Sequence, residues 1–180
     1  MSGNMIERIM IFVDGPNIYW GLKNHNQENE TNLSIDYKKL IEHLANGRRL
    51  IRTTYYCSRP VPADVNHIKF TDYLRSVGVK VIEKDLKNRT DSVTGKSKKI
   101  EKGVDVALAT DILSLAWENA YDTAIVASGD GDYVGAVDKI MDKGKSAEMV
   151  SFRKSLSGEL KKTAMKVTYM DDIIQQIRKV

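Results

Sequence analysis

The stretch IMIFVDGPN, residues 9–17, decides the fold of this chain. Its apolar run, residues 8–13, is typical of a strand that is buried on both faces of a parallel sheet. The run ends in Asp14, and the glycine and proline that follow turn the chain at once. An aspartate in this place has two interpretations. It caps the next helix, or it joins Asn17 in a metal or phosphate site.

Predicted strands and helices alternate along the whole chain. Strands are expected at Arg8–Val13, Leu50–Cys57, Val79–Glu83, Thr123–Ala127, Ala147–Ser151 and, as an edge strand, Val167–Tyr169. Helices are expected at Ile18–Asn24, Tyr37–Ala45, Ala63–Ser76, Val104–Asn119, Tyr133–Asp142, Gly158–Ala164 and Asp171–Lys179. His25–Asn32 is polar and predicts a loop, and Lys84–Lys99 forms either an extended hairpin or a mobile basic loop. This order predicts an α/β fold with a parallel sheet between two layers of helices.

The composition narrows the class of protein. A length of 180 residues suits one domain, which we place at residues 8–180 after a short leader at residues 1–7. One cysteine excludes an internal disulfide, and three histidines leave no room for a Cys/His zinc site. A net charge of +4 is compatible with a polyanionic partner. With neither a signal peptide nor a membrane-spanning run, a cytoplasmic protein is expected.

Polar residues follow two of the predicted strands, where an open α/β sheet binds its ligands. The first strand leads to Asp14, and SGDGD, residues 128–132, leads from another with Ser128, Asp130 and Asp132. Asp105 opens the helix in KGVDVALATD, residues 102–111, where the helix dipole stabilises a carboxylate. Asp111 lies six residues later, about 120° away around the helix, and is expected to play a supporting or structural part. Converging carboxylates predict a site for Mg²⁺ or Mn²⁺ and hydrolysis of a phosphodiester.

Other interpretations of these motifs were weighed. A calcium loop starting at Asp130 needs a glutamate at its twelfth position, which is Met141. A phosphoaspartate mechanism needs a second aspartate two residues after Asp14, and that residue is Pro16. The SGDGD segment also fits a capped turn that opens a helix, or the DxD pair of a nucleotide-sugar site.

A basic stretch precedes Asp105 and predicts contacts with the phosphates of a nucleic acid. The alternative is a solvated loop. Aromatic residues beside the acidic motifs, Tyr19, Trp20 and Tyr133, either stack on unpaired bases or pack in the core. The basic residues are Lys84, Lys87, Arg89, Lys96, Lys98, Lys99 and Lys102.

The combination of motifs resembles the NYN domain, a branch of the PIN-like nuclease superfamily. IFVDGPN at residues 11–17, KGVDVALATD at 102–111 and IVASGDGDYVGAVDKIMDKGK at 125–145 follow the order of the family. The segment FRKSLSGELKKTAMKVTYMDDI, residues 152–173, is similar to its closing part. The resemblance implies a Rossmann-like, PIN-like three-layer α/β/α sandwich with an acidic, Mg²⁺- or Mn²⁺-binding centre that cleaves RNA.

The resemblance also implies roles for individual residues. Catalytic metal ligands fall on Asp14, Asp105, Asp130 and Asp132. Substrate contacts fall on Asn17 and Ser128, to which the residue pattern adds Lys96, Lys98, Lys99 and Lys102. Many relatives carry a further acid on the helix after the first strand, which Ile18–Gly21 lacks. The site is therefore expected to hold one metal firmly and a second only with substrate.

The expected function is a metal-dependent endoribonuclease acting on single-stranded RNA. Two alternatives remain: a non-catalytic, regulatory RNA-binding module that kept the fold, and a phosphohydrolase acting on a small phosphate. Neither a membrane partner nor a specific dimer interface is indicated. A homodimer through the terminal helix or an edge strand is compatible with the sequence.

Overall fold

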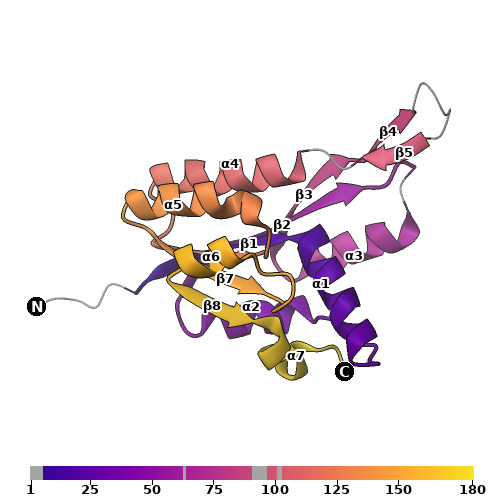
Figure 1. The fold of residues 1–180 in the computed structure, drawn as a ribbon, viewed down its shortest axis with the longest axis horizontal. Helices are drawn as coiled ribbons and strands as arrows, with labels where there is room; N and C mark the ends of the chain where they lie inside the picture. The colour runs from indigo at the N-terminus through magenta and orange to yellow at the C-terminus, as the bar shows by residue number, and fades with distance from the viewer. Residues whose placement is uncertain (1–5, 63, 91–96, 101–102) are drawn as a thin grey trace, which may run out of the picture.

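The computed structural model describes residues 6–62, 64–90, 97–100 and 103–180, with the backbone alone at 87–90 and 97–100. Six strands form one sheet in the order β3-β2-β1-β6-β7-β8, and every neighbouring pair is parallel. Figure 1 shows this sheet between layers of helices. The strands are β1 (Arg8–Asp14), β2 (Arg49–Arg59), β3 (Val79–Asp85), β6 (Thr123–Ala127), β7 (Ser146–Ser151) and β8 (Lys166–Tyr169). The predicted parallel sheet and the edge position of β8 are confirmed.

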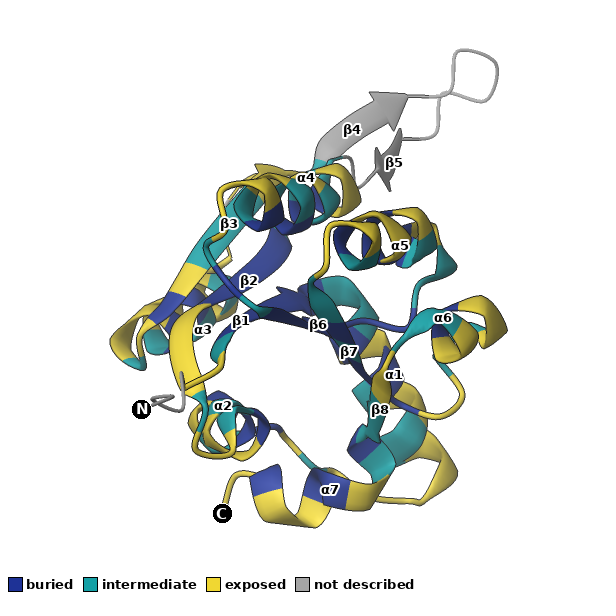
Figure 2. Ribbon diagram, turned by 90° about the vertical axis from the view of Figure 1, so that its left-hand side faces the viewer, coloured by how far each residue is buried: buried dark blue, intermediate teal, exposed yellow. Residues whose placement is uncertain are grey.

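Helices cover both faces of the sheet, as predicted. One apolar core joins the sheet to α1 (Gly15–Glu28), α2 (Tyr37–Ala45), α3 (Val65–Ser76) and α7 (Met170–Ile177). The other core joins it to α4 (Val104–Trp117), α5 (Val134–Asp142) and α6 (Gly158–Thr163). In Figure 2 the buried residues follow the strands and the inner sides of these helices. The described residues thus form a three-layer α/β/α sandwich.

Strand β1 lies at the centre and determines where Asp14 points. Ile9, Ile11 and Val13 enter the first core, while Met10 and Phe12 enter the second. Side chains alternate between the two faces of a strand, so Asp14 follows Met10 and Phe12 toward α4 and α5. The alternation explains why an uninterrupted apolar run is needed here, since neither face of β1 meets solvent.

Helix α1 is longer than predicted. We expected a helix only at Ile18–Asn24, with DGPN as a turn before it and a loop from His25, whereas α1 runs from Gly15 to Glu28. Asp14 is its N-cap, and the proline falls in the first turn, where its missing N–H costs no helical hydrogen bond. The interpretation of Asp14 as a helix cap is confirmed, whereas the separate turn at residues 15–17 and the loop from His25 are wrong, because polarity alone does not end a helix.

The basic segment forms a hairpin, one of the two predicted alternatives. Strands β4 (Lys87–Thr90) and β5 (Ser97–Ile100) pair in the antiparallel direction, separately from the main sheet. A short 3₁₀ turn, η1 (Gly131–Tyr133), precedes α5, so the helix expected from Tyr133 begins one residue later. No helix in the described part of the chain is long and apolar enough to cross a membrane.

Candidate metal and phosphodiester site

Asp14 is the buried centre of the candidate site. Its side chain sits at the carboxyl end of β1, with only 2% of the residue exposed. One oxygen, Oδ1, accepts a hydrogen bond from the backbone N–H of Asn17 at 3.1 Å and so caps α1. The other, Oδ2, accepts a hydrogen bond from Ser128 Oγ at 2.8 Å. The helix-cap interpretation of this aspartate is therefore confirmed for Oδ1, while Oδ2 faces the loop after β6, and a metal or phosphate role stays a prediction.

Tyr133 connects the two carboxylates that the sequence places far apart. Its hydroxyl oxygen lies 3.3 Å from Asp14 Oδ2 and 3.2 Å from Asp105 Oδ1. The residue is 1% exposed, so its ring belongs to the core and does not stack on bases. Burial, followed by the charges of Asp14 and Asp105, raises the pKa of Tyr133 far above its ordinary value. The hydroxyl therefore stays protonated and can donate one hydrogen bond, either to Asp14 or to Asp105.

Tyr133 is the site residue that the sequence did not reveal. Its position directly after SGDGD was noted, but only base stacking and core packing were considered for it. The hydroxyl group was the available signal, because a buried tyrosine O–H needs a polar partner.

The loop after β6 is fastened to α1 and to its own turns. Asn17 Oδ1 accepts a hydrogen bond from the backbone N–H of Gly129 at 2.9 Å. The N–H of Asp130 donates to Ser128 Oγ at 3.1 Å, and the N–H of Asp132 donates to Asp130 Oδ1 at 3.0 Å. The last contact is the capped turn that we weighed as an alternative for this segment. Asp130 is half-buried and Asp132 is exposed at the rim.

Close packing fixes the position of this loop. A Cβ atom built on Gly129 would lie 2.0 Å from the backbone carbonyl oxygen of Ser155. Only a residue without a side chain fits there, because backbone atoms cannot move aside cheaply. The glycine lets the loop approach the segment after β7 closely, which brings Ser128 within reach of Asp14.

Burial and a neighbouring like charge both act on the Asp14 carboxylate. Burial is the main reason that the pKa of Asp14 is raised, and the nearby charge of Asp105 raises it further. The hydrogen bonds from Asn17, Ser128 and Tyr133 act in the opposite direction. Among the residues that the structure describes, none of the carboxylates of Asp14, Asp105, Asp130 and Asp132 forms an ion pair.

The donor set fits a hard cation held by two carboxylates. No group of three or more His, Cys, Asp or Glu side chains within the described ranges is arranged to hold a metal ion. Mg²⁺, however, is commonly bound through one or two carboxylates, with water and phosphate oxygens as its other ligands. Asp14 and Asp105 share the Tyr133 hydroxyl, and the negative charge of Asp105 raises the pKa of Asp14. A cation between the two carboxylates would offset this repulsion. Ligation by Asp14, Asp105, Asp130 and Asp132 stays a prediction.

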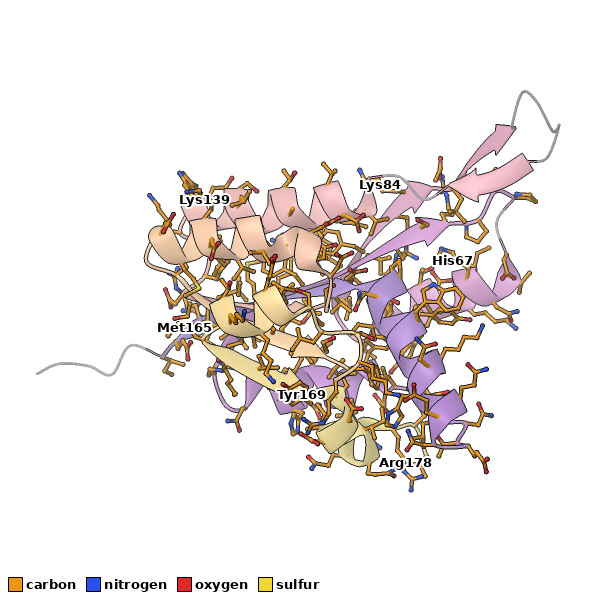
Figure 3. All side chains as sticks on the ribbon, viewed as in Figure 1. His67, Lys84, Lys139, Met165, Tyr169 and Arg178 are labelled. Carbon is orange, nitrogen blue, oxygen red and sulfur yellow. The ribbon has the colours of Figure 1, made fainter. Side chains whose placement is uncertain are left out.

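The remaining predicted residues divide into two groups. Asp111 Oδ2 accepts a 2.7 Å hydrogen bond from the buried hydroxyl of Tyr56, which is the β2 neighbour of Asp14 in the sheet. Lys84 lines a 670 Å³ groove with Gly103 and Asp111, beside the first turns of α4 (Figure 3). Lys96 and Lys102 lie outside the described residues, as do the side chains of Lys98 and Lys99. Their predicted contacts with substrate therefore remain predictions.

Comparisons with known proteins bear on the fold and the family of the chain. The chain is 25% identical over 174 residues to the low amplitude and bright protein LabA of Synechococcus elongatus, covering 96% of this chain and 88% of that protein. A crystal structure of a protein of unknown function from Vibrio parahaemolyticus superposes with a TM-score of 0.78 at 22% identity, covering 99% of this chain and all of the other. The latter likeness supports the fold alone. The family model of the NYN domain matches residues 8–171, and the chain therefore belongs to the NYN domain family.

Proposed function

We propose that this protein is a metal-dependent ribonuclease that hydrolyses phosphodiester bonds of RNA at the carboxyl edge of its sheet. The observation that carries the proposal is the pair of carboxylates, Asp14 and Asp105, joined through Tyr133 with no cationic partner among the described residues. Membership of the NYN domain family, which is related to the PIN-like nucleases, supports the same chemistry.

Each residue of the site has a part that follows from its surroundings. Asp14 and Asp105 would hold Mg²⁺ or Mn²⁺, and Asp130 and Asp132 would add oxygen ligands from the rim once substrate is present. A bound ion would supply an activated water and would offset negative charge on the leaving oxygen. Hydrolysis of this kind would produce a 5′-phosphate and a 3′-hydroxyl. Asn17 holds the loop at Gly129, and Ser128 fixes the orientation of the Asp14 carboxylate.

The phosphates on either side of the cleaved bond need positive partners. The basic arm, residues 84–102, leads directly into α4 and Asp105. We propose that Lys96, Lys98, Lys99 and Lys102 bind the RNA backbone there, which makes the affinity dependent on salt.

The test is a cleavage assay on labelled single-stranded RNA in Mn²⁺, Mg²⁺ or EDTA, comparing the wild type with Asp14→Asn. Metal-dependent cutting that is lost in the variant supports the proposal. Equal cutting by both proteins would refute it. If the protein neither cut nor bound RNA, the result would favour a small phosphate as the substrate.

A second candidate is an RNA-binding module without hydrolysis. The observation in its favour is that both oxygens of Asp14 are already hydrogen-bonded, with Oδ1 serving as a helix cap. The same assay separates the two functions, because RNA that is bound but never cut in any metal would select this candidate.

A further inference from the structure

The outer face of α1 carries two exposed aromatic rings close to the acidic site. Tyr19 is 57% exposed and Trp20 is 55% exposed, and their ring centroids lie 5.3 Å apart at an interplanar angle of 78°. Lys23 Nζ lies 4.6 Å from the centre of the Trp20 ring. Trp20 follows Asn17 by three residues, so the two side chains are neighbours on the helix surface. Asn17 in turn touches Gly129.

A groove of about 720 Å³ opens beside Tyr19, between α1, residues 31–35 and Phe70 of α3. Its apolar lining comes from Ile18, Leu22, Tyr37, Tyr55 and Phe70. The last three rings contact one another edge to face at 5.4–5.7 Å. The volume lies in the range of pockets that bind small organic groups.

Tyr55, which lines the groove, packs against the residue next to Asp14. A Cβ atom built on Gly15, the residue after Asp14, would lie 2.6 Å from the Tyr55 ring. Tyr55 and Asp14 belong to opposite faces of the sheet, because Tyr55 lies in the first core and Asp14 points toward α4. A chain that contacts both must therefore pass over the carboxyl edge.

The charge and rigidity of the groove indicate what it binds. Lys23 and Lys179 line it, and the described residues contribute no aspartate or glutamate to that lining. Asn26 holds the far wall, because it donates to the carbonyl oxygen of Leu33 at 2.9 Å and accepts from the N–H of Leu33 at 3.0 Å. Flat aromatic surfaces with nearby cations and no anions suit nucleobases joined by phosphates.

We propose that Trp20, Tyr19 and the groove between α1 and α3 bind unpaired bases of a single-stranded RNA next to the phosphodiester held at Asp14. This inference deepens the proposed ribonuclease function and rests on it for the identity of the polymer. Bases in a duplex are stacked and paired, so they cannot reach these rings. The substrate class is therefore single-stranded, with bases splayed away from the cleaved bond.

The chain supplies a matched control. Trp117 on α4 is 54% exposed, and Lys143 Nζ lies 5.4 Å from its ring centre, so it repeats the aromatic–lysine pair elsewhere. It lines a separate groove with Lys139. Figure 3 shows Lys139 at the opposite end of the α4 and α5 layer from Lys84 and His67.

The experiment measures binding of a labelled 12-nucleotide RNA in EDTA, which prevents metal-dependent cutting. We expect Trp20→Ala to weaken binding about 10-fold, as the loss of one stacked base predicts, and Trp117→Ala to leave it unchanged. The same RNA with abasic nucleotides should bind the wild type and Trp20→Ala equally. Each Trp→Phe variant keeps a single tryptophan whose fluorescence can be followed. RNA should quench the fluorescence of Trp20 in the Trp117→Phe variant. It should not quench the fluorescence of Trp117 in the Trp20→Phe variant.

Equal affinities of the Trp20→Ala and Trp117→Ala variants for intact RNA would overturn the inference, as would equal binding of a duplex. Its failure is distinguishable from failure of the proposed function. Cutting without any effect of Trp20 would overturn the base-binding surface alone. Base-dependent quenching of Trp20 without cutting in any metal would uphold the surface and refute the ribonuclease.

Discussion

Two sets of carboxylates at opposite ends of the sheet are surrounded very differently. At the amino ends of the strands, Asp122 Oδ1 pairs with Arg8 at 2.7 Å, and Glu148 pairs with Arg48 at 2.7 Å. At the carboxyl ends, the carboxylates of Asp14 and Asp105 share the Tyr133 hydroxyl as a hydrogen-bond partner. The arginine hydrogen bonds lower the pKa of Asp122, whereas burial raises that of Asp14.

This difference separates carboxylates whose cationic partners the fold supplies from carboxylates that have none among the described residues. A carboxylate beside arginine gains a partner from the chain itself, and folding alone satisfies it. A buried carboxylate beside another carboxylate is costly unless something positive arrives from outside. Functional sites commonly carry such a cost, and the strain is offset by the stability of the rest of the fold.

The largest expected effect is the loss of RNA cleavage when the Asp14 carboxylate is neutralised. Asp14→Asn keeps the helix cap, because asparagine caps as well as aspartate does, but it removes the buried charge. We expect RNA cleavage in Mn²⁺ to fall by about 100-fold or more, in line with the loss of a key electrostatic group, without loss of thermal stability.

Asp122→Asn is the control at the other end of the sheet. It should lower the free energy of unfolding slightly and leave cleavage unchanged, because Arg8 loses a charged partner far from the site. Cleavage rates and urea unfolding of both variants test the comparison. If both variants lost activity equally, or both lost stability equally, the two ends would not differ as we describe.

The second effect tests whether close packing, rather than ion pairing, holds the carboxyl edge. Gly129→Ala should lower the free energy of unfolding by about 3 kcal/mol, since its Cβ would meet the Ser155 carbonyl oxygen at 2.0 Å. Gly135→Ala on α5 has no atom within 4 Å of its new methyl group and should gain about 0.5–1 kcal/mol. Urea unfolding measures both, and a mild effect at Gly129 would mean that the loop is free to shift.

The third effect isolates the hydroxyl group between the carboxylates. Tyr133→Phe keeps the buried ring and should weaken Mn²⁺ binding about 10-fold, because the orientation of Asp14 and Asp105 is lost. Tyr121→Phe is matched, since that buried hydroxyl donates to the Ile112 carbonyl oxygen at 2.7 Å. Each variant should lose about 1 kcal/mol of stability. A Mn²⁺ titration that uses the thermal unfolding temperature as its readout should distinguish the Tyr133→Phe and Tyr121→Phe variants. Equal Mn²⁺ affinities of the two variants would argue against a cation beside Tyr133.

Most of the fold could be predicted because it depends on patterns within each segment. The apolar runs of β1 and β6 and the caps and glycines at helix ends gave strand and helix positions, and their alternation gave a parallel sheet. The exception was α1, where Asp14 and the proline act as a helix start. Local polarity at His25 could not show that the helix continues to Glu28.

The site was harder to predict because it depends on distances between segments. Ligand-binding residues of an open α/β sheet lie at the carboxyl ends of its strands, which predicted that Asp14 and Ser128 are close together. In the structure, Ser128 Oγ lies 2.8 Å from Asp14 Oδ2. Nothing in the spacing of Asp105 could show that a buried tyrosine hydroxyl, from η1, joins it to Asp14. Likewise, the cavity beside Tyr19 is formed by residues from α1, α2, β2 and α3, which only the packed structure brings together.

The smallest effect is on the pH dependence of stability, and it should have opposite signs at the two ends. Asp14 has a folded-state pKa above its ordinary value of 3.8, so its ionisation destabilises the fold as the pH rises from below 3.8 through the folded-state pKa. Asp122 has a lowered pKa, so its stabilising contribution is complete above 3.8 and is lost as the pH falls through its folded-state pKa. Urea unfolding between pH 3 and pH 7 should show Asp14→Asn gaining stability relative to the wild type with rising pH, and Asp122→Asn losing it. Parallel curves for the three proteins would contradict the contrast, whatever their absolute stabilities.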